Sequence, residues 1–129
     1  MVDEVAPLKA EAETVVPHAW RRTLAAIVDS LIQGDTRIGE GVKFVEPLSE
    51  ADSRVCREIV VNYGSVTLIP LPDATWDTSV AKWWNDNRWD CLVDLWTAEE
   101  GRSDLVLTAT VFEDPDRGFR IHPGLVYVP

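Results

Sequence analysis

Cysteine, histidine and methionine are scarce in this chain, whose 129 residues include two, two and one of them. Two cysteines are too few for the disulfide framework that stabilises many small secreted domains. Cys56 and Cys91 each lie in an apolar run, so we expect two buried free thiols. His18 and His122 are far apart, and no pair of cysteines or histidines has ligand spacing, so no metal site is predicted.

Positive charge is in short supply as well. The chain has 12 lysines and arginines against 22 carboxylates, which gives a formal net charge of −10 at pH 7. Because nucleic acids and anionic membrane surfaces are bound through basic side chains, we expect neither as a partner. A basic protein is the partner that this charge would attract, and solubility alone is the other interpretation.

Long apolar runs are absent. No stretch approaches the roughly 20 residues of a membrane-spanning helix, and the acidic N-terminal stretch lacks the apolar segment of a signal peptide. Together with the two unpaired thiols, these features predict a cytoplasmic protein. We expect residues 1–16 to form an acidic flexible leader and residues 17–129 to form a single domain of ordinary size.

Apolar periodicity predicts two helices followed by strands. Residues 17–33 and 50–63 have apolar side chains three and four positions apart. Later segments have the composition of strands separated by turn residues: 42–46, 66–69, 89–97, 105–112, 119–121 and 125–128. Residues 76–84 fit either a strand or one helical turn. We therefore predict an α+β fold with two N-terminal helices packed on one face of a curved antiparallel sheet of four to five strands.

Motifs for covalent or phosphate chemistry are missing, since the chain has no G-x-S-x-G elbow and no glycine-rich loop followed by Lys-Ser or Lys-Thr. We therefore predict no catalytic residue and no cofactor, and favour a non-enzymatic role. One alternative stays open. Asp90, Asp94 and Trp96 share a face of the strand 89–97, and on a curved sheet they would line a small-molecule pocket or a minor enzyme centre. The other interpretation is a partly covered outer sheet face.

A charged turn follows that strand. Arg102 is expected to pair with Glu99, Asp104 or Asp94 across a hairpin, which favours a structural role for the turn. The alternative is a binding loop that includes Glu99, Glu100 and Arg102.

Tryptophan is abundant, with six in the chain. Trp83 and Trp84 are adjacent, with Trp76 before them and Trp89 after the next turn. Neighbours in a strand point to opposite faces, so a sheet covered on one side leaves one of the pair exposed. Large exposed aromatic side chains mark interfaces. The alternative is that residues 70–90 fold over the core and bury both.

The stretch from Trp89 to Leu107 contains Leu-Trp-Thr at 95–97, Glu-Glu-Gly-Arg-Ser-Asp at 99–104 and Leu-Val-Leu at 105–107. This hairpin resembles one shared by a family of small uncharacterised bacterial proteins. The resemblance implies a bacterial source and transfers no catalytic residue. The order of helices and strands is also similar to that of NTF2-like and cystatin-like α+β proteins, which implies a shallow cone between helices and sheet.

Three hypotheses follow for the function. The first is a protein-interaction module, immunity-like or regulatory, with an acidic, tryptophan-containing surface for a basic protein. The second is the small-molecule pocket or minor enzyme, and the third is a homodimer with tryptophans at its interface. The candidate binding residues are Trp76, Trp83, Trp84, Trp89, Asp90, Asp94, Trp96, Glu99, Glu100 and Arg102.

Overall fold

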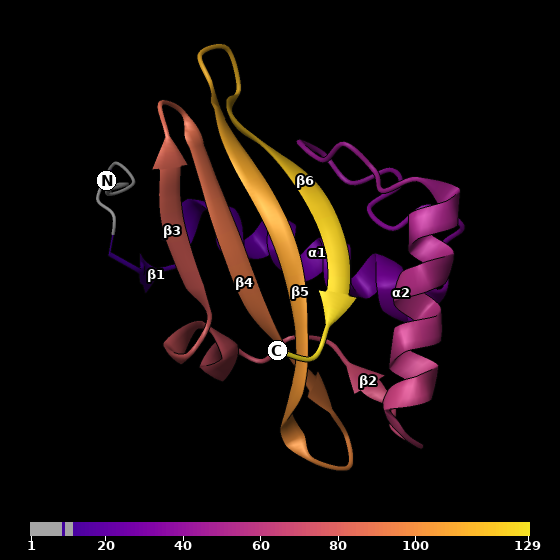
Figure 1. Cartoon of the computed structure of the whole chain (residues 1–129). Coiled ribbons are helices and arrows are strands. Elements are labelled where there is room, and N and C mark those ends of the chain that lie inside the picture. Colours follow the sequence, from indigo (N-terminus) through magenta and orange to yellow (C-terminus); the bar gives the residue numbers. More distant parts are fainter. Residues whose placement is uncertain (1–8, 10–11) are drawn as a thin grey trace.

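The computed structural model describes residue 9 and residues 12–129, and it confirms the α+β fold (Figure 1). Two helices accompany six strands that pair antiparallel in one sheet, in the order β1-β3-β4-β5-β6 with β2 paired to β4. The elements in chain order are β1 (Thr14–Val15), α1 (His18–Gln33), α2 (Glu50–Tyr63), β2 (Leu68–Ile69), the 3-10 helix η1 (Asp73–Asp77), β3 (Val80–Asn85), β4 (Arg88–Thr97), β5 (Gly101–Asp114) and β6 (Gly118–Tyr127). The sheet has six strands and not the four or five expected, because the two-residue strands β1 and β2 also pair with it.

The helix α1 crosses behind the sheet and supplies most of the cover for one face (Figure 1). Leu24, Ile27 and Val28 are buried along its inner side. Trp20, in the first turn of the helix, contacts Trp89 of β4 edge to face, with 5.5 Å between ring centroids. The helix ends where Gly34 adopts a left-handed conformation and donates its N–H to the last turn.

The helix α2 stands beside β6. Its first turn is capped by Ser49, whose hydroxyl accepts from the Asp52 N–H at 3.1 Å. Cys56 is fully buried against β6, and the Val126 N–H donates to its sulfur at 3.4 Å. This helix therefore covers the edge of the sheet next to β6, while α1 covers its face.

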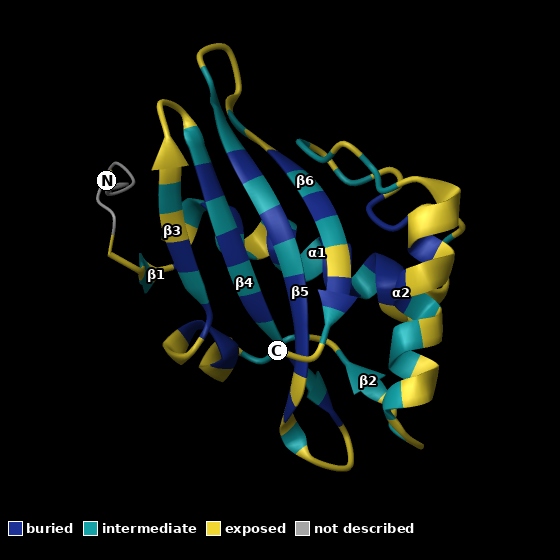
Figure 2. Ribbon diagram, viewed as in Figure 1, coloured by how far each residue is buried: buried dark blue, intermediate teal, exposed yellow. Residues whose placement is uncertain are grey.

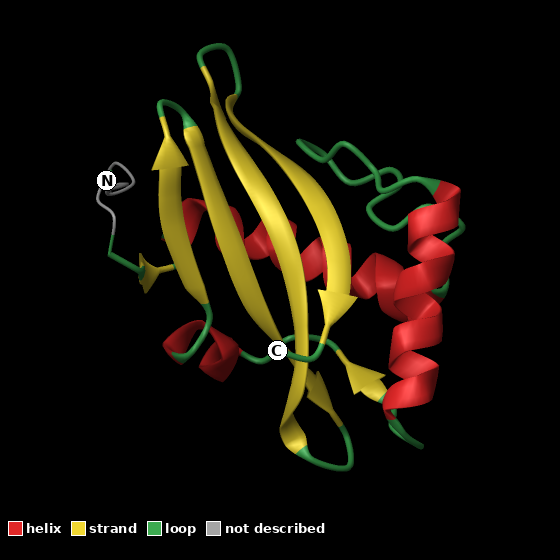
Figure 3. Cartoon of the chain, viewed as in Figure 1, coloured by secondary structure: helices red, strands yellow, loops and turns green. Residues whose placement is uncertain are grey.

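The strand β4 separates the core from an open face. Trp89, Cys91, Val93 and Leu95 are fully buried, and the residues between them are half-buried (Figure 2). One face of the sheet is crossed by α1, and no helix of the described chain crosses the strands on the other face, which is in front in Figure 3. The predicted alternation of residues 89–97 is confirmed, and we call the helix-free side the open face.

The strand β6 corrects the prediction of two short strands at 119–121 and 125–128. It is one strand, and it contains Pro123 and Gly124. Leu107 pairs with Val126 and Ala109 with Pro123, so β6 has one more residue than β5 in this interval. Such a β-bulge accommodates a proline without a ladder hydrogen bond, so the strand bends and continues.

Other boundaries also differ from the sequence prediction. Residues 76–84 contain both expected structures, since Trp76 lies in η1 and Val80 begins β3. Residues 42–46 form no strand beyond a single bridge from Val45 to Ile121. Most of the predicted leader, residues 1–16, lies outside the described residues, although Thr14–Val15 forms β1 and Val16 is fully buried. None of the described helices has the length and apolar character needed to cross a bilayer.

Candidate functional site

Trp84 is the extra residue of a bulge in β3. Trp83 pairs with Trp89 and Asn85 pairs with Arg88, so two steps along β3 face one step along β4. The bulge interrupts the alternation of the strand next to the turn, where Asp86 has a positive φ of 39°. The Trp84 side chain is 60% exposed, whereas Trp83 packs on the core and donates its indole N–H to the Asp86 carbonyl at 3.1 Å.

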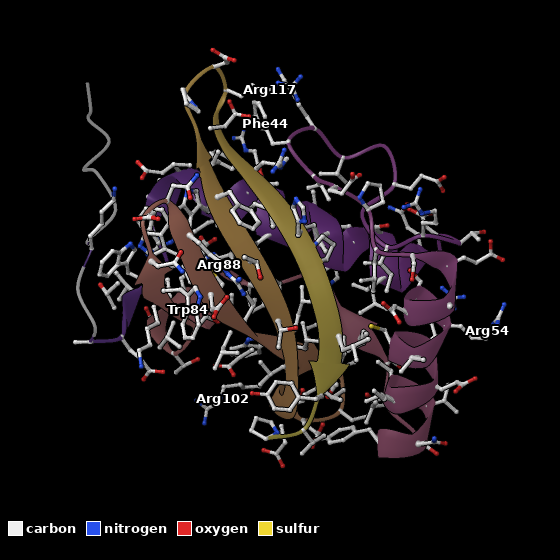
Figure 4. The ribbon with its side chains drawn as sticks, turned by 45° about the horizontal axis from the view of Figure 1, so that its top comes forward. Phe44, Arg54, Trp84, Arg88, Arg102 and Arg117 are labelled. Atoms are coloured by element: carbon white, nitrogen blue, oxygen red, sulfur yellow. The ribbon has the colours of Figure 1, made fainter. Side chains whose placement is uncertain are left out.

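Arg88 supports the exposed indole. Its guanidinium carbon lies 5.7 Å from the centroid of the Trp84 ring, and its terminal nitrogen is 3.5 Å from Asp90 Oδ1 (Figure 4). Thr110 Oγ1 on β5 also lies 3.5 Å from that carboxylate oxygen. Cation–π stacking and the carboxylate together restrain the rotamers of Arg88, which favours a defined orientation of Trp84.

Two hairpin turns lie side by side next to Trp84. The Glu113 N–H donates to the Asn87 carbonyl at 2.8 Å, and the Asn87 side chain donates to the Glu113 carbonyl at 3.2 Å. The β3–β4 turn carries Asp86, and the β5–β6 turn carries Asp114 and Asp116. These three carboxylates form no ion pair with any described cation, although Arg117 lies in the second turn. We call Trp84, Asp86, Asp114 and Asp116 the hairpin-tip surface.

The predicted tryptophan cluster is dispersed. Trp76 and Trp89 are buried in the core, and Trp96 is half-buried on the open face, where its ring packs over Gly101. Of the six tryptophans, Trp84 alone is exposed. The sequence left open whether one member of the Trp83–Trp84 pair is exposed or both are buried. Trp83 pairs with the buried Trp89, so it lies on the core side, and Trp84 is the exposed member.

Asp90, Asp94 and Trp96 do share one side of β4, and that side is the open face. The Asp94 carboxylate accepts from the Thr78 hydroxyl at 2.5 Å, and Asp90 is held by Arg88 and Thr110. The two carboxylates therefore have structural partners, and the strand holds them along a sheet surface.

The charged turn between β4 and β5 is tied to its surroundings by its glutamates. Glu99 accepts from the Thr67 N–H at 2.7 Å and from its hydroxyl at 3.0 Å, and this backbone hydrogen bond lowers the pKa of the Glu99 carboxyl. Glu100 accepts from the Tyr63 hydroxyl at 2.9 Å. The expected ion pair of Arg102 is not formed, because its side chain lies out in solvent with no described carboxylate within 4 Å (Figure 4). The glutamates anchor the turn in its place.

Both thiols are free and buried, as predicted. Burial raises the pKa of Cys91 to about 12, with a smaller contribution from Asp90. Burial also raises the pKa of Cys56. A thiol that stays protonated is a poor nucleophile, so neither side chain is suited to covalent chemistry near neutral pH.

Comparison with known proteins gives a family and no closer relative. Neither a curated protein nor a solved structure matches the chain. Residues 28–129 match a family, and this segment runs from the middle of α1 through every strand after β1. The match includes the hairpin on which the resemblance to a family of unknown function was based. Because it spans most of the chain, the chain belongs to the family described as a domain of unknown function (DUF7668).

Proposed function

We propose that this protein is an interaction module that binds a basic protein through the hairpin-tip surface, with Trp84 as the anchor. The single observation that carries the proposal is the 60% exposure of a tryptophan that is held by a neighbouring guanidinium. An exposed indole is costly in water, and tryptophan is the residue most enriched at the energetic centres of protein interfaces.

The charge around Trp84 supports a basic partner. Asp86, Asp114 and Asp116 lie in the two adjoining turns and form no ion pair with the described residues, and the whole chain carries a net charge of −10. Carboxylates at the rim of an interface accelerate the encounter with a cationic surface and make it sensitive to salt. Bacterial origin is part of this proposal and rests on the resemblance carried by residues 89–107. The immunity-like or regulatory role is also part of it, and rests on the net charge of −10 and the tryptophan-rich segment 76–89.

The proposal is tested by affinity capture from an extract of the organism that encodes the chain. Wild type, Trp84→Ala and Val61→Ala are compared, because Val61 is a 73% exposed apolar residue on α2 and serves as the matched control. We expect one or a few basic proteins to be retained by wild type and Val61→Ala, lost with Trp84→Ala, and released by moderate salt. Equal retention by Trp84→Ala, or retention of acidic proteins alone, would contradict the proposal.

A further inference from the structure

The structure also contains a basic cleft at the other end of β3. A cavity of about 700 Å³ opens between the first turns of α1 and the segment that contains η1. Its walls include His18, Arg21, Arg22, Leu71, Asp73 and Trp76. The volume lies within the range of small-molecule sites, which is roughly 300–1,000 Å³.

Arg21 is held rigidly in this cleft. Its Nε donates to the Val16 carbonyl at 3.0 Å, and its guanidinium carbon lies 5.7 Å from the centroid of the Trp76 ring. These contacts leave the two terminal nitrogens without a hydrogen-bond acceptor among the described residues. A restrained guanidinium loses little conformational entropy when it binds an anion, which favours affinity.

Arg22 is the second cation of the cleft, and it is exposed. Neither Arg21 nor Arg22 has a described carboxylate within 4 Å, although acids outnumber bases almost two to one in the chain. Both arginines line the same cleft, so two positive charges are available to one ligand. An unpaired guanidinium pair is suited to a carboxylate or another planar oxyanion.

The rest of the cleft narrows the class of ligand. Leu71, Trp76 and Ala25 provide an apolar wall, which suits a ligand with a hydrophobic body. Asp73 on the same rim would repel a polyanion such as a nucleoside polyphosphate. We propose that this cleft binds a small monoanion, an organic carboxylate with an apolar or aromatic body, whose carboxylate contacts Arg21 and Arg22.

This site is separate from the proposed interaction surface. η1 precedes β3, and the hairpin-tip surface follows its other end, so the two sites lie at opposite ends of that strand (Figure 1). Arg21 and Arg22 also precede residues 28–129, so the family match does not include them. Ligand binding in the cleft can therefore be tested separately from partner binding at the hairpin-tip surface.

The test uses benzoate as the probe, benzyl alcohol as its neutral counterpart, and inorganic phosphate as an anion without a body. Each is titrated at constant ionic strength into the labelled full-length protein, and the Trp76 indole N–H and the amides of residues 18–25 are followed by NMR. We expect benzoate to cause saturable changes in the chemical shifts of these signals. Benzyl alcohol and inorganic phosphate should bind much more weakly. Equal binding of benzyl alcohol or of phosphate would overturn the proposed ligand class, and so would the absence of saturable benzoate binding.

Two substitutions distinguish a specific contact in the cleft from a nonspecific effect of the protein's charge. Arg22→Gln should weaken benzoate binding by about tenfold, the loss expected for one charge-assisted contact. Arg54→Gln is the matched control, because Arg54 is an exposed arginine on α2 that does not line the cleft. An unchanged affinity in Arg22→Gln, or an equal loss in Arg54→Gln, would also overturn the proposal.

Discussion

The tryptophans show how one residue type takes different roles in different surroundings. Trp89 is fully buried in edge-to-face contact with Trp20, whereas Trp84 projects from a bulge and contacts a guanidinium. Trp83, one position away, has its indole N–H bound to the turn. The position of each indole relative to the strand pleat, and to the bulge, determines whether it stabilises the core or remains available to a partner.

Replacement of these two side chains should therefore have very different costs. We expect Trp89→Ala to lower the free energy of unfolding by about 3–5 kcal/mol, because it leaves a large cavity in the core. Trp84→Ala should cost less than about 1 kcal/mol, since it removes mainly an exposed cation–π contact. Urea unfolding followed by circular dichroism measures both values. Similar losses for the two variants would mean that Trp84 is part of the core.

His122 gives the open face a titration that can be measured. It pairs with Thr110, and its ring meets Phe112 at 5.1 Å between centroids. Burial lowers the pKa of its imidazole, Arg120 lowers it further, and Glu46 acts in the opposite direction. The folded protein therefore binds this proton less readily than the unfolded chain. The contribution of His122 to the free energy of unfolding is therefore fully present above about pH 6.5, the pKa of an unfolded histidine. It is lost as the pH falls through the pKa of His122 in the folded protein.

We expect an NMR titration of the His122 ring to have its midpoint below about 6.5, the ordinary value for histidine. Arg120→Gln should raise this pKa and Glu46→Gln should lower it further, because the two charges act in opposite senses. A midpoint at or above the ordinary value, or a fall in Arg120→Gln, would show that His122 is not in the environment described.

At the level of elements, the bend in β6 depends on close contact with β5. A Cβ added at Gly124 would overlap the Thr108 hydroxyl, which donates to the Leu125 carbonyl at 2.8 Å. The glycine therefore allows the two strands to approach each other within the bulge.

A double-mutant cycle tests this contact. Gly124→Ala should cost about 1–3 kcal/mol of unfolding free energy through overpacking. Adding Thr108→Ala should recover part of that loss, since the overlapping hydroxyl is removed. Thr108→Ala alone is the control. Strictly additive losses would show that the two residues do not constrain each other.

The elements also show what the sequence can and cannot predict. Helix 50–63 has the predicted boundaries because its signals are local, with Ser49 as the cap and Gly64 after the last turn. Residues 119–128 were divided wrongly, because proline and glycine usually end a strand and only the pairing with β5 shows a bulge. The pairing of Arg21 with Trp76 could not be inferred, because these residues are far apart in sequence and meet only in the folded chain.

At the scale of the whole molecule, α1 covers one face of the sheet and α2 covers one edge, and no helix of residues 12–129 covers the other face (Figure 3). Trp84 lies where the open face meets the turns, so a partner could contact the indole and the acidic residues together. The net charge of −10 acts over the entire molecule, and it would attract a basic partner before any contact forms. The candidate site is thus explained by the bulge in β3, the adjacent turns and the charge of the chain acting together.

Photo-crosslinking in living cells tests this central claim most directly. A benzophenone amino acid is introduced at position 84 in one variant and at position 61 in another, and the crosslinked products are identified by mass spectrometry. We expect a defined adduct with a basic protein from position 84 and none from position 61. An adduct of two copies of this chain, or the same products from both positions, would contradict the proposed role of Trp84 in binding a basic partner.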